Sequence, residues 1–493
     1  MLSGLRGSGT AVIAARAVIL VQVVFSLVRL WAPPELYDQG IYLSSARFVA
    51  DGLVPFRDFL SPYGPGLSYT NATLIWAQVD YLPAHRLLWA LGHLVLSLLL
   101  LRLAARRGLL PIGVAVLAAL LLVPVAPTYL VPGICVLLAV EWLDREVPRI
   151  GGALLLLGVA AWFRWDFLAV LGLAGLLLLL TMAGRRLTVI AWGAAATVVA
   201  LAPYALLASL GGFGGIRQTV EYSLFSFAEF RGLPYPWSAP VDLVRALFEV
   251  EPGLLLNHAI EILAYLLAPM AVVVALVAVI RAGNARHVLT QPAVLVALSW
   301  GAVSLYSLRV RADWFHASPL IVALGVVLLL LVPPGVQWVR VASVAVVAVV
   351  ALLLVPHTAW LYVQQVYQRP GLDAALVEAR EHVRPGDRLF VSNVDNSTAF
   401  VNAPFLYWAL EAKPASRVTH FDPGYADQDD VQREIVEELC AARPVVVQWD
   451  APVGEETSGR QFSDVLDEHL ADAYRPVLDD GEFVVLEPNG DGC

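Results

Sequence analysis

Charged side chains stand beside long apolar segments at three places in the chain. These places are the region from Asp38 to Asp58, the segment 163–166 and the stretch 307–316. A charge next to an apolar segment of membrane-spanning length is costly and usually marks a functional site. Arginine can hold phosphate oxygens with two parallel N–H groups and keeps its charge, whereas a carboxylate can accept a proton. The residue types therefore predict a site that binds a phosphate group and moves a proton.

The stretch 307–316 is the densest of the three. It contains Arg309, Arg311, Asp313 and His316, just ahead of another apolar segment. We assign Arg311 to a bound phosphate group, with Arg309 as a second contact, because a planar guanidinium matches phosphate geometry. His316 is expected to donate to this phosphate or to the group attached to it, although a lone histidine is more often structural. Asp313 completes this predicted binding cluster.

A second arginine–aspartate pair, Arg164 and Asp166, lies between two apolar segments. Arg164 is expected to bind the same phosphate group. Asp166 is expected to bind hydroxyl groups of the molecule that carries this phosphate or to hold Arg164 in place. The alternative is a pair that only satisfies itself in a turn between helices, and the sequence leaves both interpretations open.

The composition requires a large part of the chain to lie in a membrane. Of 493 residues, 59% are hydrophobic and only 15% are charged, whereas soluble domains have about 45–50% apolar and about 25% charged residues. Residues 369–493 hold 10 basic and 25 acidic residues, which leaves the first 368 at +6 within a net charge of −9. An acidic soluble part argues against nucleic acid as a partner, because phosphate backbones need a basic face.

Apolar segments of spanning length predict about 11 transmembrane helices. They are 11–31, 87–104, 110–127, 129–143, 150–162, 168–183, 188–210, 259–281, 289–307, 317–334 and 341–360. Arginines flank alternate connections between them, at Arg102, Arg106, Arg107, Arg145, Arg149, Arg185, Arg186, Arg281, Arg286 and Arg340. Basic connections face the cytoplasm, so we expect a multi-pass protein of the plasma (inner) membrane with a cytoplasmic N-terminus. The large loops 32–86 and 211–258 and the C-terminal part then lie outside.

The chain divides into a membrane domain, 1–368, and an acidic extracytoplasmic α/β domain, 369–493. In the second domain, helical spacing at 372–383, 431–440 and 462–470 alternates with apolar, strand-like runs at 388–391, 444–448 and 483–486. Strands that alternate with helices predict a small parallel sheet. The three cysteines are far apart and predict no disulfide framework.

The first outer loop carries the segments Tyr37-Asp38-Gln39-Gly40-Ile41-Tyr42, Ala50-Asp51-Gly52, Phe56-Arg57-Asp58-Phe59 and Tyr63-Gly64-Pro65-Gly66. With this topology, the chain resembles the GT-C superfamily of membrane glycosyltransferases. Within it, the chain is most similar to the branch of protein O-mannosyltransferases and lipid A aminoarabinose transferases. The resemblance implies a multi-helix bundle with a large first outer loop and a soluble C-terminal domain.

The resemblance also implies that Asp38 is the general base that deprotonates the acceptor hydroxyl. Asp58 is expected to be a second acid, or to position the acceptor or Asp38. Many relatives have an acidic residue directly after this aspartate, but here it is Gln39, which leaves the use of a divalent cation open and assigns no metal ligand. The alternative for Asp38 is a simple helix cap, a common role for aspartate.

The function that we expect is inverting transfer of a sugar from a polyprenyl-phosphate-linked donor to an extracytoplasmic glycan, lipid or protein, with no other cofactor assigned. One alternative is a transporter or flippase of a lipid-linked glycan, which would need charges along a path through the bilayer and repeat symmetry. The other is a non-catalytic membrane scaffold. The sequence does not identify the sugar, the acceptor or the oligomeric state.

Overall fold

The computed structural model describes residues 9–32, 34–122, 125–222, 268–281, 288–310, 314–333, 371–397, 401–421, 425–426, 428–450 and 463–489, with isolated residues 241, 245 and 262. The chain divides into two compact units. The first contains 1–31, 85–202 and 234–364, and the second contains 32–84, 203–233 and 365–493. The second unit thus groups most of the first outer loop with the C-terminal part of the chain, and the predicted domain boundary at residue 369 stays a prediction.

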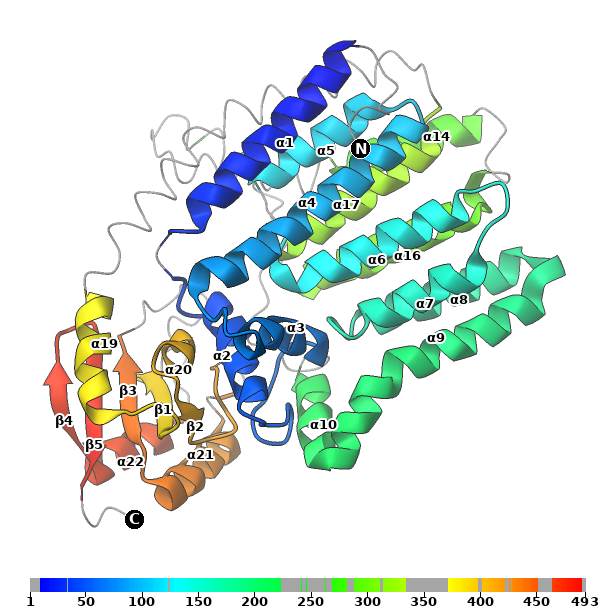
Figure 1. The fold of residues 1–493 in the computed structure, drawn as a ribbon. Coiled ribbons are helices and arrows are strands. Elements are labelled where there is room, and N and C mark those ends of the chain that lie inside the picture. Colours follow the sequence, from blue (N-terminus) through cyan, green and yellow to red (C-terminus); the bar gives the residue numbers. More distant parts are fainter. Residues whose placement is uncertain are drawn as a thin grey trace. The chain divides into compact units, whose positions relative to one another are not determined.

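The first unit is a bundle of apolar helices (Figure 1). The helices are α1 (Gly9–Arg29), α4 (Leu82–Arg106), α5 (Leu110–Leu122), α6 (Pro127–Leu143), α7 (Ile150–Ala160), α8 (Phe167–Thr181), α9 (Arg186–Leu207), α14 (Ala268–Arg281), α16 (Pro292–Val310) and α17 (Trp314–Leu331). Ten of the eleven predicted segments thus contain a helix. The eleventh, 341–360, lies outside the described residues, so the number eleven stays a prediction.

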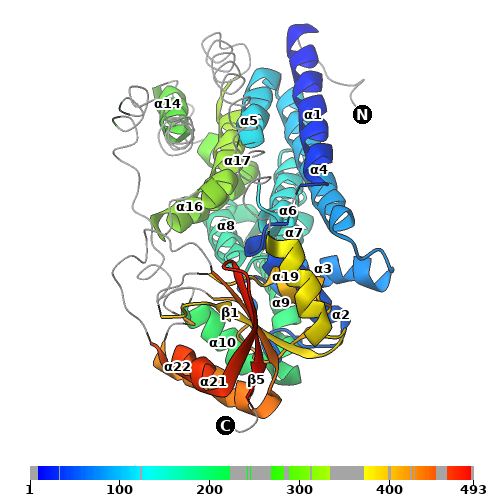
Figure 2. The ribbon, with the colours of Figure 1, turned by 90° about the vertical axis from the view of Figure 1, so that its left-hand side faces the viewer.

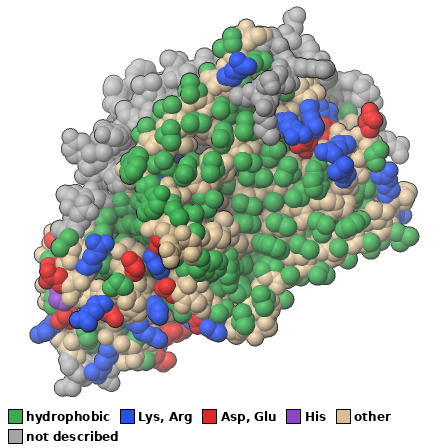
Figure 3. Space-filling model, viewed as in Figure 1, with side chains coloured by type: hydrophobic (Ala, Val, Ile, Leu, Met, Phe, Trp, Pro, Cys, Tyr) green, Lys and Arg blue, Asp and Glu red, His purple; other side chains and the backbone are tan. Residues whose placement is uncertain are grey.

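These helices are apolar on their outer faces as well as inside. Within the described residues, Gly9–Arg29, Leu82–Arg106 and Ala183–Glu221 are long and apolar enough to cross a membrane, and six further apolar helices are shorter. Large side chains such as Ile13, Leu180 and Leu187 are more than half exposed, and hydrophobic atoms cover most of this face in Figure 3. A helix that is apolar all round suits lipid rather than water. The chain is therefore an integral membrane protein.

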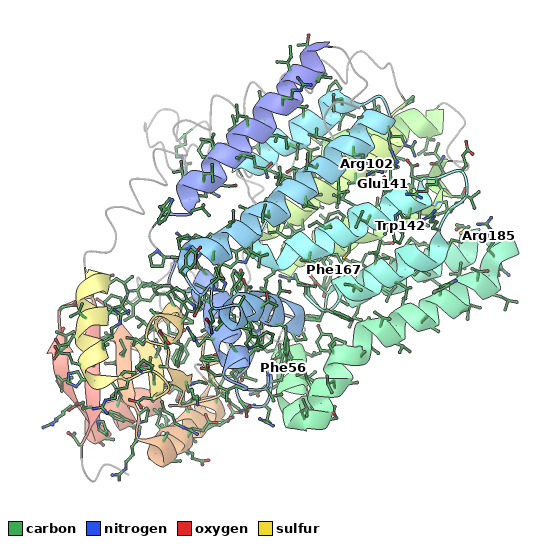
Figure 4. All side chains as sticks on the ribbon, viewed as in Figure 1. Phe56, Arg102, Glu141, Trp142, Phe167 and Arg185 are labelled. Carbon is green, nitrogen blue, oxygen red and sulfur yellow. The ribbon has the colours of Figure 1, made fainter. Side chains whose placement is uncertain are left out.

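Ion pairs gather at one end of this bundle. Glu141 of α6 accepts from Arg102 at 2.8 Å and from Arg106 at 2.6 Å, both on α4, and Arg107 pairs with Asp144. Figure 4 shows Arg102, Glu141, Trp142 and Arg185 toward this end, and Phe167 away from it. The basic connections after α4, α6 and α8 therefore share one end, as the topology prediction requires, while their orientation in the membrane stays a prediction.

The second unit combines the first outer loop with the C-terminal domain. Its elements before the domain are α2 (Asp38–Ala50), α3 (Pro65–Trp76), η3 (Ala208–Gly212) and α10 (Phe213–Glu221). Nine of the 13 residues of α2 are buried, because α2 packs against the C-terminal helix α20 (Phe405–Ala409).

The C-terminal domain is a five-stranded sheet with helices on both faces (Figure 2). Its strands are β1 (Arg388–Asn393), β2 (Lys413–Pro414), β3 (Val445–Trp449), β4 (Tyr474–Asp479) and β5 (Phe483–Pro488), and its other helices are α19 (Gly371–His382), α21 (Asp429–Ala442) and α22 (Val465–Ala473). The order is β2-β1-β3-β5-β4. The predicted strands at 388–391, 444–448 and 483–486 are confirmed as β1, β3 and β5, and all three predicted helices are present.

The prediction of an all-parallel sheet is wrong. The strands β2, β1 and β3 are parallel, whereas β5 runs antiparallel to both β3 and β4. The cause is a tight hairpin between β4 and β5. Gly481 takes a left-handed φ of +84°, and the Asp480 carboxylate accepts the backbone N–H groups of Glu482 and Phe483 at 2.9 and 2.7 Å.

The core of this domain extends into the first loop. Leu60 is buried in the same apolar cluster as Phe390, Ile435 and Leu486, and Tyr222 packs against the cluster. The N–H of Leu60 also donates to the carbonyl of Arg417 at 2.8 Å. The prediction of no disulfide framework also needs correction, because Cys440 is disulfide-bonded.

Candidate functional site

Asp38 is the first residue of α2, and another side chain caps that helix. The carboxylate of Glu35 accepts the backbone N–H of Tyr37 at 2.8 Å and that of Gln39 at 2.5 Å. In return, the side chain of Gln39 accepts the N–H of Glu35 at 3.2 Å. This reciprocal arrangement satisfies the N–H groups that start the helix, as a capping box does. Glu35 therefore caps the start of α2.

Two tyrosines share the surroundings of Asp38. Tyr42 lies one helical turn after Asp38, and its ring centroid is 5.5 Å from that of Tyr63. Burial raises the pKa of Tyr42 well above its ordinary value, and the nearby Tyr63 and Asp38 add to the shift. Tyr42 therefore stays protonated beside the half-buried Asp38. Sequence analysis did not predict this role for Tyr42.

The other end of α2 is tied to the C-terminal domain by an ion pair. Arg47 pairs with Asp80, and both side chains are about one-seventh exposed. The second oxygen of Asp80 accepts the indole N–H of Trp408 at 2.9 Å, while Arg47 lies 4.0 Å from Glu411. One carboxylate thus joins α2 to α20.

Asp58 sits in a different setting. Its carboxylate takes two guanidinium N–H groups of Arg57, at 2.8 and 2.7 Å, and the backbone N–H of Val54 at 2.7 Å. The hydrogen bonds from Arg57 are the main reason that the pKa of Asp58 is lowered. An ionised, fully engaged carboxylate suits the predicted positioning role better than that of a proton donor.

The turn at Asp58 is closely packed against another helix of the same unit. A Cβ on Gly215 would lie 2.0 Å from the carbonyl oxygen of Phe56, so only glycine lets α10 approach this turn (Figure 4 labels Phe56). Asp58 binds the backbone at Val54, which follows the last turn of α2, whereas Asp38 begins that helix. Because an α-helix rises about 1.5 Å per residue, the ends of α2 are about 18 Å apart. The turn at Asp58 therefore braces the far end of α2.

Arg164 and Asp166 lie in the turn between α7 and α8. The Nε of Arg164 donates to Asp166 at 3.2 Å, and both side chains are about one-seventh exposed. The guanidinium carbon lies 4.0 Å from the centre of the Tyr129 ring, a distance at which a cation is attracted to the ring face. This ion pair fits both interpretations, a partner that holds Arg164 and a pair that satisfies itself in a turn. The contact with Tyr129 was not predicted from the sequence.

Two buried donors extend this region. In the described part of the chain, the hydroxyl of Thr128 and the indole N–H of Trp300 have no hydrogen-bond partner. Thr128 precedes Tyr129 at the start of α6, and the ring of Trp300 faces Phe167, 6.5 Å away. Polar groups in a bundle core usually have partners, so these donors fit a polar ligand. Sequence analysis did not single out Thr128 or Trp300, because each is an isolated residue within an apolar segment.

Four further predicted residues, in the stretch 307–316, have no described side chain. Arg311 and Asp313 lie outside the described residues, and the side chains of Arg309 and His316 are likewise not described, although both belong to helices, α16 and α17. The described residues contain no group of three His, Cys, Asp or Glu side chains that could hold a metal ion. The acidic pair Asp429 and Asp430 forms the first turn of α21, where negative charge stabilises a helix.

The architecture defines a class of membrane protein. A bundle of apolar helices is combined with a unit in which the first interhelical loop and a C-terminal α/β domain share one core. The chain has this fold in common with ArnT from Cupriavidus metallidurans, solved with bound undecaprenyl phosphate, at a TM-score of 0.60 over 99% of each chain. The two sequences are 16% identical. No protein-family model and no curated protein matches the chain.

ArnT is a lipid A aminoarabinose transferase of the GT-C family. The resemblance to that branch inferred from the sequence is therefore confirmed at the level of the fold, over the whole chain.

Proposed function

We propose that the protein is a GT-C-type glycosyltransferase that moves a sugar from a polyprenyl-phosphate donor to an acceptor outside the inner membrane. The observation that carries the proposal is the full-length likeness in fold to a protein solved with undecaprenyl phosphate. The setting of Asp38 is compatible with it, because Asp38 begins α2 at a place where the backbone on either side is held by Glu35.

The chemistry is a single inverting displacement. The acceptor oxygen attacks the anomeric carbon, the bond from that carbon to the phosphate oxygen breaks, and Asp38 takes the hydroxyl proton. The polyprenyl phosphate leaves with the bonding electron pair, and arginines stabilise its negative charge. We assign this function to Arg164, supported by Tyr129 and Asp166, and to Arg311 and Arg309, with Asp313 and His316 beside them.

The proposed orientation puts the second unit outside the cytoplasm. Arginines at one end of the bundle are expected to face the cytoplasm, because basic connections do so in most membrane proteins. The disulfide at Cys440 agrees, because disulfides persist in oxidising compartments and are rare in the cytosol. A cysteine introduced at Ser458 should react with an impermeant thiol reagent in intact cells. Labelling only after lysis would reverse the topology.

The test of the reaction uses the full-length protein in lipid nanodiscs. It is mixed with a panel of undecaprenyl-phosphate monosaccharides and an extract of envelope glycans and lipids, and free undecaprenyl phosphate is measured by mass spectrometry. Release that depends on the extract, with sugar recovered on an extract component, supports the proposal. Movement of an intact lipid-linked sugar across vesicle membranes without release would support a flippase instead.

A further inference from the structure

The residues around Asp38 are held by backbone atoms of the C-terminal domain. The N–H of Phe405 donates to the carbonyl of Leu36 at 3.1 Å. The hydroxyl of Tyr37 donates to the carbonyl of Phe421 at 2.7 Å. Leu36, Tyr37 and Phe421 are all buried, so these hydrogen bonds are shielded from water. The two residues before Asp38 are thus fixed by contacts from nearly 400 residues further along the chain.

A buried asparagine carries this connection into the sheet. The side-chain oxygen of Asn402 accepts the N–H of Phe421 at 3.1 Å. Its side-chain nitrogen donates to the carbonyl of Val391, in β1, at 2.8 Å and to that of Thr419 at 3.3 Å. Asn402 is completely buried. A series of hydrogen bonds therefore runs from Tyr37 through the backbone of Phe421 and the side chain of Asn402 to the central part of the sheet.

The residue two positions after Asp38 is fixed by close packing. A Cβ on Gly40 would lie 2.3 Å from the backbone nitrogen of Phe405 and 3.0 Å from its Cα. No real Cβ approaches so closely, so α2 rests directly on the start of α20. Asp38 therefore lies between Tyr37, held by a hydrogen bond, and Gly40, held by packing.

We propose that the C-terminal domain positions the base, with Tyr37 and Asn402 as positioning residues that act through the backbone of Asp38. The proposal rests on the proposed function, in which Asp38 takes the acceptor proton. A base works only within hydrogen-bond reach of that proton, and an error of about 1 Å in a reacting group can reduce the rate about a hundredfold. The domain is thus part of the catalytic machinery.

The chain offers a matched pair of variants. Tyr37→Phe removes the hydroxyl that joins α2 to Phe421. Tyr407→Phe removes another buried tyrosine hydroxyl of the same unit, which accepts the N–H of Val391 at 3.1 Å. Each variant keeps its ring and loses one buried hydrogen bond, so both should lower the melting temperature by a similar amount. Only the first variant breaks the connection to Asp38.

The experiment compares kcat and donor KM of the full-length variants in nanodiscs, using the member of the undecaprenyl-phosphate panel that the wild type turns over fastest. Tyr37→Phe should lower kcat at least tenfold and leave the donor KM within twofold. Tyr407→Phe should keep kcat within twofold. Gly40→Ala should lower kcat further. A Tyr37→Phe variant with more than half of the wild-type kcat, or an equal loss in Tyr407→Phe, would overturn the proposal.

Hydrogen exchange provides a readout that needs no substrate. Amides of Gln39 to Ile41 should exchange faster in Tyr37→Phe than in the wild type, and Tyr407→Phe should leave them unchanged; unchanged exchange in both would overturn the positioning. The two hypotheses fail differently. A fully active Asp38→Asn would remove the proposed base, whereas an inactive Asp38→Asn with a fully active Tyr37→Phe would reject only the positioning by the C-terminal domain.

Discussion

Asp38 at the start of α2 and Arg164 in the turn between α7 and α8 are both charged, but the two residues are held in opposite ways. Arg164 contacts the carboxylate of Asp166, two residues further along the chain, and the ring of Tyr129. Asp38 lies in a backbone that is fixed from a distant part of the chain and seated on a helix start that admits only glycine. In the mechanism that we propose, a guanidinium that follows a phosphate can tolerate adjustment, whereas a base must meet one proton at one place. The two settings agree with these proposed roles.

The largest expected effect tests the base itself. Asp38→Asn should lower kcat by at least a hundredfold, because general base catalysis contributes about 10²–10⁴-fold, while the protein still inserts and folds. Asp51→Asn is the matched control, since Asp51 follows the last residue of the same helix. Undecaprenyl phosphate release measures both. Retention of more than about a tenth of wild-type turnover in Asp38→Asn would reject its role.

The second prediction tests charge in the bundle. Arg164→Ala should raise the donor KM by roughly ten- to a hundredfold, since a hydrogen bond to a charged group contributes about 1.5–3 kcal/mol. Arg164→Lys should restore part of the loss, because lysine brings the charge without the planar fork. Arg107 forms an ion pair with Asp144 just after α6, whereas Arg164 lies over Tyr129 at the start of that helix. Arg107→Ala should therefore leave the donor KM unchanged. If Arg164→Ala raised only the KM for the acceptor, Arg164 would bind the acceptor and not the donor phosphate.

A smaller effect is expected in the tie between α2 and α20. Arg47 and Asp80 are mostly buried, whereas Arg217 and Glu221 of α10 form an ion pair with both side chains more than half exposed. A double-mutant cycle on Arg47 and Asp80 should show a coupling of about 1–3 kcal/mol, against about 0.5 kcal/mol or less for Arg217 and Glu221. Chemical denaturation followed by tryptophan fluorescence measures both cycles. Equal coupling would show that this tie does not stabilise the unit.

The smallest expected effect depends on pH. Because Arg57 lowers the pKa of Asp58, this carboxylate stabilises the fold above the ordinary aspartate pKa of about 3.9. That contribution is lost as the pH falls through the lower, folded-state pKa. The melting temperatures of the wild type and Asp58→Asn should therefore differ at pH 7 and converge below about pH 4. A constant difference in melting temperature across this pH range would show that Asp58 does not contribute to the loss of stability in acid.

The sequence predicted the elements whose signals are local. Apolar length located the bundle helices, and the apolar runs at 388–391 and 444–448 located β1 and β3. The Asp480-Gly481 pair was a hairpin signal that would have indicated the antiparallel β5, whereas the two-residue β2 has no pattern of its own. Asp38 was predicted only through a family resemblance. The spacing of Glu35 and Gln39 is a capping signal that would have predicted Glu35 as the residue that caps α2. The contacts of Tyr37 with Phe421 and of Gly40 with Phe405 could not be predicted, because they join segments far apart in the sequence and no local pattern marks them.

The separation between these contacting segments also sets an order of events during synthesis. Tyr37 and Phe421 are 384 positions apart, so the turn at Asp38 leaves the ribosome long before the backbone that holds it exists. At about 5–20 residues per second, the delay is roughly 20 to 80 s. A truncated or stalled chain would lack the contacts that fix the backbone beside Asp38. Under our proposal, the late arrival of the last quarter of the chain then keeps unfinished molecules inactive.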